Sequence, residues 1–403
     1  MAPIKMPVSS ENALFNGKIN IDINKNRIYC VFFRNFMMKI IISTLLVFFY
    51  LMVNVLALTP QKKHDPDVNW PTNEWTINTE NFIGNSTFNN KIEKLFSSDS
   101  YNMYGKTNSL LIIQNGEIIF ERYNEGIKDD TKLVSWSMAK SYTAAITGIM
   151  LDKGYISSIN EKNLLPNWED LRKEITIDHL LNMKPGLEFI EEYTIEGRSD
   201  TAEMLFDEGM LDQGKFAADY PLIKLPGTFY NYSTGTTNIL SYILKNKLNE
   251  NGLDYFDFIN QSLLRPLGLR DTTLEFDKSG TFIGGSSIYA SARDYAKFGY
   301  LYLRDGVWDK EQIISKKWID ETRVPSKHTY NMYSNKFWHV NKYWKNSFNF
   351  PEDTYYCAGF GGQYIMIIPS KDLVVVRLGE TYNTSTDNLL SFLGEIILEV
   401  PSK

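Results

Sequence analysis

A serine and a lysine three positions apart, Ser137 and Lys140, are the residues in this chain whose types and spacing could do chemistry. A helix-forming run, Ala139 to Leu151, begins at the same place. Helix residues three apart share a face, so the amine of Lys140 can reach the hydroxyl of Ser137. A buried lysine is less readily charged and can act as a base that activates the serine. The free N–H groups at a helix start can steady an oxyanion.

Ser-x-x-Lys spacing is also common on solvated helix faces, so the surrounding residues must decide between the two interpretations. The segments Ser135–Ser141 and Pro226–Thr234 resemble the serine hydrolases related to class C beta-lactamases. Further matches in the family's order are Ile175–Met183, Arg265–Leu269, Gly284–Ala290, Arg293–Gly299 and Gly359–Gln363. The resemblance covers about Lys106 to Val400 and is nearest to the branch of esterases and 6-aminohexanoate-dimer hydrolases.

The resemblance implies a catalytic role for Tyr232. In an extended or tightly turned segment, residues two apart point the same way, so Tyr232 and Thr234 can both face Ser137. A tyrosine there can pass a proton to the leaving group, and its phenol would ionise more easily beside a Lys140 cation. The alternative is that Tyr232 packs, as most of the 24 tyrosines do. Relatives usually carry asparagine at position 234, and the hydroxyl of Thr234 replaces an amide that both donates and accepts.

We expect the third element of the site, Cys357–Phe360, on the edge of the sheet. Aligned by Gly359, the resemblance implies an oxyanion hole made of the backbone N–H groups of Ser137 and Phe360. Cys357 stands where beta-lactamases have a lysine, so the charge that meets a substrate carboxylate is missing. This favours an esterase or amidase acting on neutral acyl substrates. The Gly-rich segment can also be aligned one residue differently.

Several residues are weaker candidates for substrate binding, Thr234 and Gly359 among them. Gln363 is expected to order the Gly-rich strand or to line the cleft. Asp200 lies where the 6-aminohexanoate-dimer hydrolases place an acidic substrate contact, although a solvated surface carboxylate is the preferred interpretation. Trp136 and Trp338 can wall the cleft, while core packing is the usual role of tryptophan.

Composition bounds the remaining possibilities. The chain has 403 residues, 43% of them hydrophobic and 14% aromatic, which is enough for one sizeable core. A net charge of -6 and the lack of a long basic run argue against a nucleic-acid partner. The two cysteines, Cys30 and Cys357, fall on opposite sides of the hydrophobic segment, so neither an intramolecular disulfide nor a cysteine metal site is expected in the exported part. We expect no metal, no cofactor, and a small ester or amide as the substrate.

The N-terminal region carries an export signal. Residues Ile40 to Leu58 are almost wholly apolar and follow Lys39. Read from Met38, the stretch 38–58 is a secretory signal peptide; read from Met1, it is long enough to anchor the chain in a bilayer. In both cases we expect the catalytic part outside the cytoplasm, periplasmic, secreted or anchored, with membrane contact through this segment alone if it is uncleaved. Residues 1–37 are an uncertain leader or an over-extended start.

Periodicity predicts an α/β (α+β) fold, an antiparallel sheet flanked by helices plus a helical lobe at about 154–285. The resemblance implies that this fold is of the beta-lactamase/transpeptidase type. The strands Asn108–Ile113 and Glu117–Arg122 flank a hairpin signal, and Tyr364–Ile368 and Asp372–Leu378 form a second pair. Both pairs are expected in one sheet, in a domain at 106–400 after a lead-in at 59–105. The expected helices are Ala139–Leu151, Asp178–Met183, Ala202–Leu211, Asn238–Leu248, Tyr255–Leu264, Arg293–Leu303, Ser315–Arg323 and Asp387–Val400.

The function expected on these grounds is that of an exported serine hydrolase that forms an acyl-enzyme on Ser137. Whether Lys140 or Tyr232 is the base stays open. Two alternatives also stay open. The first is a beta-lactamase or penicillin-binding D-alanyl carboxypeptidase. The second is an inactive ligand-binding protein on the same fold, because fold does not fix activity.

Overall fold

The computed structural model describes residues 58–402, apart from 82–83, 193–198, 330, 341–347 and 383–385. The part from Leu58 onward is one compact unit. The predicted signal peptide or anchor at 38–58 and the leader at 1–37 fall, up to residue 57, outside the described residues. In the described part, no helix combines the length and the apolar character needed to cross a membrane.

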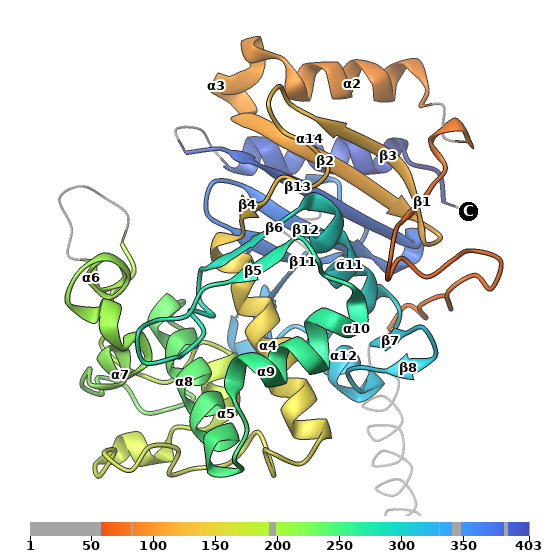
Figure 1. Ribbon diagram of the computed structural model, residues 1–403. Coiled ribbons are helices and arrows are strands. Elements are labelled where there is room, and N and C mark those ends of the chain that lie inside the picture. The colour runs from red at the N-terminus through yellow and green to blue at the C-terminus, as the bar shows by residue number, and fades with distance from the viewer. Residues whose placement is uncertain are drawn as a thin grey trace, which may run out of the picture. The chain divides into compact units, whose positions relative to one another are not determined.

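A large sheet holds strands from both ends of the domain, as predicted, but it is mixed and not wholly antiparallel, because Thr76–Ile77 pairs parallel with the strand Glu117–Tyr123 (Figure 1). In the described residues it has eight strands in the order β1-β3-β2-β13-β12-β11-β10-β9. The strands β2 (Lys106–Gln114) and β13 (Leu373–Glu380), from the two ends of the domain, are neighbours in this sheet and run antiparallel. The other strands are β1 (Thr76–Ile77), β3 (Glu117–Tyr123), β9 (Tyr333–Ser334), β10 (Phe337–His339), β11 (Tyr355–Gly359) and β12 (Gln363–Ile368).

The predicted hairpin between β2 and β3 is confirmed. Its turn residues, Asn115 and Gly116, have positive φ angles of 52° and 83°, a region that suits asparagine and glycine. Alternate side chains of β2 enter two different cores, Leu110 and Ile112 on one face and Leu111 and Ile113 on the other. Both faces of the sheet are therefore covered.

Two helices cover one face of the sheet (Figure 1). They are α2 (Ser86–Phe96) and α14 (Thr386–Glu399), the second of which was predicted. Phe88 of α2 and Leu393 of α14 are buried in the same core as Ile112 of β2. Next to them, Tyr104 at the end of α3 (Tyr101–Tyr104) stacks on Phe392 with 4.4 Å between ring centroids.

The other face carries the helices that build the site. The helix α11 (Ala292–Leu303) lies on the sheet, with Gly299 against Val374, and α4 (Ala139–Asp152) packs on α11 through the stacked rings of Tyr142 and Phe298. Almost every residue of α4 is buried, which is typical of a central helix that is apolar on all sides. Burial of α4 is what carries Lys140 into the interior.

The helical lobe packs around α4. Its predicted helices are confirmed except that the one expected at Ala202–Leu211 ends at Phe206 and is followed by a separate 3-10 turn, Glu208–Leu211. Its long helix, α8 (Thr234–Glu250), contacts both α4 and α5. The other helices are α5 (Ile177–Leu181), α6 (Asp200–Phe206), α7 (Gln213–Ala218), α9 (Tyr255–Ile259), α10 (Arg265–Leu267) and, outside the lobe, α12 (Lys316–Thr322). Short strands that were not predicted are β4 (Leu133–Val134), β5 (Thr272–Leu274), β6 (Ile288–Ala290), β7 (Val307–Trp308) and β8 (Glu311–Gln312).

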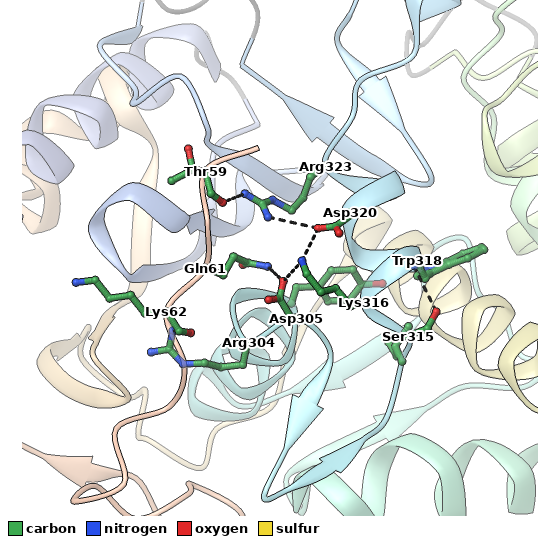
Figure 2. Close-up of polar contacts among 12 residues, drawn as sticks. Thr59, Gln61, Lys62, Arg304, Asp305, Ser315, Lys316, Trp318, Asp320 and Arg323 are labelled. Atoms are coloured by element: carbon green, nitrogen blue, oxygen red, sulfur yellow. Dashed lines mark hydrogen bonds and ion pairs between the residues drawn. The ribbon is translucent and has the colours of Figure 1, made fainter. Parts of the chain in front are cut away.

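The first described residues pass the C-terminal ends of α11 and α12 (Figure 2). Arg323 donates to the carbonyl of Thr59, and Arg304 Nη1 donates to the carbonyl of Lys62 at 2.9 Å. Arg304 is itself buried and pairs with the carboxylate of Asp372, with Nη2 and Oδ2 3.0 Å apart. The predicted lead-in is thus packed into the same unit as the residues that follow it.

The strand that ends at Gly359 is not the edge of the sheet, which corrects the sequence-based expectation. The strands β10 and β9 lie outside β11. Their hairpin turns at Asn335 and Lys336, both with positive φ, and a lysine there carries no turn signal in the sequence. The pairing of β10 with β11 ends at Tyr356, so the last residues of β11 reach beyond it toward the turn that carries Ser137.

Candidate active site

Ser137 lies on a tight turn directly before α4. The turn, Trp136–Met138, is a 3-10 helix, and Trp136 has a φ of 44°, which is uncommon for a bulky residue. Such backbone strain concentrates at functional sites. The end of β11 closes on this turn, because a Cβ on Gly359 would lie 2.1 Å from the carbonyl oxygen of Ser135. Only glycine permits this approach, which places the chain after Gly359 beside Ser137.

Lys140 is buried, with 1% of its surface exposed, and its amine contacts three neutral acceptors. The distances from Nζ are 2.9 Å to Ser137 Oγ, 2.8 Å to Thr234 Oγ1 and 2.7 Å to the carbonyl oxygen of Gly285. Burial lowers the pKa of Lys140 to about 8, and the charge of Glu191 partly opposes that shift. A substantial neutral fraction therefore exists near physiological pH, as a general base requires.

The helix α8 fixes two of these acceptors. Thr234 is its first residue, and Asn238, one turn later, accepts a hydrogen bond from Gly285 N at 2.9 Å. The side chain of Asn238 also donates to Gln213 Oε1 at 2.7 Å. A Cβ on Gly285 would lie 2.6 Å from Thr234 Cγ2, so glycine lets the Gly285 carbonyl approach the amine of Lys140. The lobe thereby holds Lys140 against Ser137.

Tyr232 lies beside the amine of Lys140, close to Ser137, as the family resemblance implied. The Lys140 Nζ atom is 5.0 Å from the centroid of the Tyr232 ring. The ring packs on Trp338 with 5.5 Å between centroids and edge-on to Tyr333 at 5.9 Å. Ser233, which follows, is extended and caps α8, which turns Tyr232 and Thr234 toward the same site. The structure therefore brings together the hydroxyl, the amine and the phenol ring.

Two hollows meet at Ser137 and Phe360, and both residues line each of them. The larger, here called the α6 pocket, has a volume of about 420 Å³ and is lined by Trp136, Ser137, Glu192, Ser199, Thr201, Ala202, Leu205, Phe206, Thr234, Ser286 and Phe360. The smaller, here called the Tyr232 pocket, has a volume of about 310 Å³ and is lined by Ser137, Glu191, Tyr232, Trp338, Ala358, Gly359 and Phe360. Trp136 thus lines the α6 pocket and Trp338 lines the Tyr232 pocket.

Gln363 and Asp200 bind backbone groups and do not line either pocket. Gln363 Nε2 donates to the carbonyls of Gly379 at 2.6 Å and Phe360 at 3.0 Å, so the expectation that Gln363 orders this strand is confirmed. Asp200 is fully buried and accepts a hydrogen bond from Ile190 N at 2.7 Å. The expectation of a solvated surface carboxylate is therefore wrong: this carboxylate turns inward to bind a backbone N–H.

Glu191 is a site residue that the sequence reasoning missed. Its Oε2 atom accepts hydrogen bonds from the backbone N–H of Thr234 and, at 3.3 Å, from the hydroxyl of Thr201. The same carboxylate lines the Tyr232 pocket and raises the pKa of Lys140. A lone glutamate on a loop has no spacing pattern, so nothing in the sequence distinguished it.

Lys336 is a second buried lysine close to the site, and it too was missed. Its amine donates to the carbonyl of Leu180 and lies 3.2 Å from Met183 Sδ. Its own carbonyl accepts from the hydroxyl of Ser141, the residue after Lys140, at 2.7 Å. Burial, and then the charge of Lys140, hold the pKa of Lys336 well below the usual value for lysine. The site therefore adjoins a second amine that resists protonation.

Cys357 is fully buried, and burial raises the pKa of its thiol to about 12. A thiolate nucleophile at this position is therefore disfavoured. In the described ranges, no group of three or more His, Cys, Asp or Glu side chains could hold a metal ion.

Comparison with known proteins agrees with this geometry. The family model described as Beta-lactamase matches residues 106–389. The chain is 22% identical to the 6-aminohexanoate-dimer hydrolase of Paenarthrobacter ureafaciens over 73% of this chain and 78% of that one. It shares its fold with a family VIII carboxylesterase (16% identity, 79% and 99% covered, TM-score 0.59) and a class C beta-lactamase (14%, 79% and 98%, TM-score 0.58). The chain therefore belongs to the beta-lactamase family of serine hydrolases.

Proposed function

We propose that this protein cleaves ester or amide bonds of small neutral molecules through an acyl-enzyme on Ser137. One observation carries the proposal: the buried amine of Lys140 lies 2.9 Å from Ser137 Oγ, and its three hydrogen-bond acceptors among the described residues are all neutral. An amine in that setting is held ready to take the hydroxyl proton. The Tyr232 ring, 5.0 Å from the same amine, supports a role for its phenol as the proton donor to the leaving group.

In the proposed reaction, the amine of Lys140 takes the proton of Ser137 while Oγ attacks the carbonyl carbon. The backbone N–H groups of Ser137 and Phe360 are the proposed donors to the oxyanion. As the tetrahedral intermediate collapses, the bond to the leaving group breaks and that group takes a proton from the Tyr232 phenol. The proton on Lys140 restores the phenol. Water then attacks the acyl-enzyme with the help of Tyr232 or Lys140, and the acid leaves Ser137.

Charge in the two pockets supports neutral acyl substrates over beta-lactams. Among the described residues, the lining of the two pockets holds two carboxylates, Glu191 and Glu192, and neither lysine nor arginine. A substrate carboxylate would meet these negative charges without a cation to pair with. The names of two similar proteins, a 6-aminohexanoate-dimer hydrolase and a carboxylesterase, also point to amide and ester bonds. The apolar segment at 38–58 supports export of the catalytic part as a further element of the proposal.

Covalent labelling tests the proposal. The purified protein is treated with a fluorescent fluorophosphonate and, separately, with a fluorescent penicillin, each alongside Ser137→Ala. Fluorophosphonate labelling that is lost in Ser137→Ala, with little stable penicillin labelling, is the expected result. Strong and stable penicillin labelling would instead indicate a penicillin-binding carboxypeptidase or beta-lactamase. Labelling by neither probe would indicate an inactive ligand-binding protein.

A further inference from the structure

Resting on the proposed function, we propose that the α6 pocket binds the acyl part of the substrate, that the Tyr232 pocket binds the leaving group, and that α6 selects apolar acyl chains. The residues of α6 are separate from Ser137, Lys140 and Tyr232, so the helix would determine specificity without taking part in the chemistry. The substrates would then be esters or amides with a linear apolar acyl chain.

The position of Tyr232 decides which pocket takes which part. In a tetrahedral intermediate on Ser137, the oxyanion faces the backbone beside Phe360, and the acyl chain and the leaving group diverge from the same carbon. A group that protonates the leaving atom must lie within hydrogen-bond reach of that atom. Tyr232 lines only the smaller pocket, whereas Ser137 and Phe360 line both. The leaving group therefore enters the Tyr232 pocket, and the acyl chain enters the α6 pocket.

The wall of the α6 pocket fits an apolar chain. Ala202, Leu205 and Phe206 have the i, i+3, i+4 spacing that places side chains on one helix face, and all three line the pocket. Trp136 and Phe360 stand on the Ser137 side, edge to face, with 6.0 Å between ring centroids. Phe206 is 69% exposed and Phe360 is 43% exposed, which leaves apolar surface that a bound chain would cover. Burial of such surface drives binding.

The helix α6 is tied to the catalytic site, so its wall can discriminate by size. The hydroxyl of Ser199 caps the helix by accepting from Ala202 N at 3.2 Å. Thr201 donates to Glu191, which also binds the first residue of α8. Asp200, fully buried, accepts from Ile190 N at 2.7 Å. A wall held at three consecutive residues cannot move away freely from a chain that is too long.

Glu192 sets the charge preference of the same pocket. It is the ionisable side chain among the described residues that line the α6 pocket. A chain that ends in a carboxylate would bring two negative charges together, whereas an uncharged chain meets only the hydroxyls of residues such as Ser199 and Ser286. Acyl chains that end in a carboxylate are therefore poor substrates.

Two series of esters test the assignment. The first varies a linear acyl chain on a constant p-nitrophenyl leaving group, and the second varies the leaving group on a constant acetyl group. In the wild type, kcat/KM in the first series should rise about fourfold for each methylene until the pocket is filled. Ala202→Trp, at an exposed helix position, should move that optimum to shorter chains by at least two methylenes and keep the order within the second series. Trp338→Ala should change the order within the second series and keep the acyl-chain optimum.

A matched pair of phenylalanine variants provides a second measurement, useful if Ala202→Trp folds poorly. Phe206→Ala removes apolar wall and should lower the ratio of kcat/KM for the best long-chain ester to that for acetate by about tenfold. Phe256→Ala removes another exposed ring, 47% exposed on α9, that lines neither pocket, and the ratio should stay within about twofold of wild type. Thermal melts of all variants verify folding.

Three results would overturn the proposal. One is an acyl-chain optimum that neither Ala202→Trp nor Phe206→Ala changes. Another is a change that these variants produce in the leaving-group series instead. The third is faster turnover of an acyl chain ending in a carboxylate than of its methyl-ended analogue. If the wild type and Ser137→Ala hydrolyse both series of esters at the same rate, the proposed function itself is overturned. This outcome differs from the three above, in which turnover still depends on Ser137.

Discussion

The lowered pKa of Lys140 predicts the shape of the pH dependence of ester cleavage. If the neutral amine is the base, kcat/KM follows the neutral fraction of Lys140 in the free enzyme. With a pKa of about 8, that fraction is about one-tenth at pH 7 and about nine-tenths at pH 9. We therefore expect kcat/KM to rise about tenfold between these pH values and to level off above them. An ordinary lysine would give about a hundredfold rise over the same range, without a plateau.

Glu191 offers a way to move that profile. Its negative charge raises the pKa of Lys140, so Glu191→Gln should shift the midpoint of the rise to lower pH. The amide of glutamine retains an oxygen that can accept from the N–H of Thr234, so the start of α8 keeps its partner. Glu192→Gln is the matched control: it removes a neighbouring carboxylate that lines the α6 pocket and does not act on Lys140, and the midpoint should stay in place.

The assay measures initial rates at substrate concentrations well below KM from pH 6 to pH 10, and Ser137→Ala provides the background of spontaneous hydrolysis. Circular dichroism at each pH verifies that the fold persists. A midpoint near pH 8 that falls in Glu191→Gln and stays unchanged in Glu192→Gln supports the reasoning. A profile that is flat between pH 7 and pH 9, or a midpoint that stays the same in Glu191→Gln, would refute Lys140 as the base.

Three further predictions concern the site, its neighbouring lysine and the stability of the fold. Gly359→Ala places a Cβ against a backbone carbonyl, so the oxyanion side shifts and kcat should fall about a hundredfold in steady-state assays. The pKa of Lys336 is lower in the folded than in the unfolded state, so the wild type loses stability as pH falls below about 10.4. Lys336→Met removes this titration. Its melting temperature relative to that of the wild type should therefore rise as pH is lowered from 10 to 8. Asp372→Asn leaves the buried Arg304 without its ion pair and should cost about 3–5 kcal/mol in chemical denaturation. Glu321→Gln, which breaks an exposed pair, should cost less than about 1 kcal/mol.

Local patterns predicted most of the fold because each element depends on signals that lie within it. The Asn115-Gly116 turn predicted its hairpin, and the apolar periodicity of 139–151 predicted α4 almost to its ends. The hairpin at Asn335-Lys336 was not predicted, because a lysine is an unusual residue for a positive φ. Missing β9 and β10 is the reason why β11 was wrongly placed at the edge of the sheet.

The site could be predicted where the chemistry needs a fixed spacing. Ser137 and Lys140 are three residues apart, a spacing that brings their side chains together at the start of a helix. Tyr232 is far from both in the sequence, and only the family resemblance pointed to it. Glu191 acts through a tertiary contact with α8, and no local spacing encodes such a contact. Asp200 was expected to be a surface carboxylate, but it is buried because it accepts a hydrogen bond from a backbone N–H ten residues away in the sequence. No local pattern in the sequence encodes that contact.

Trapping the acyl-enzyme tests the central claim most directly. The protein is mixed with an ester, quenched in acid at short times, and digested for mass spectrometry of the peptide that contains Ser137. The account predicts that this peptide gains the mass of one acyl group, that the gain appears before steady-state turnover, and that Lys140→Ala slows its appearance by at least a hundredfold. Turnover with no acylated peptide, or an acyl group on another residue, would contradict it.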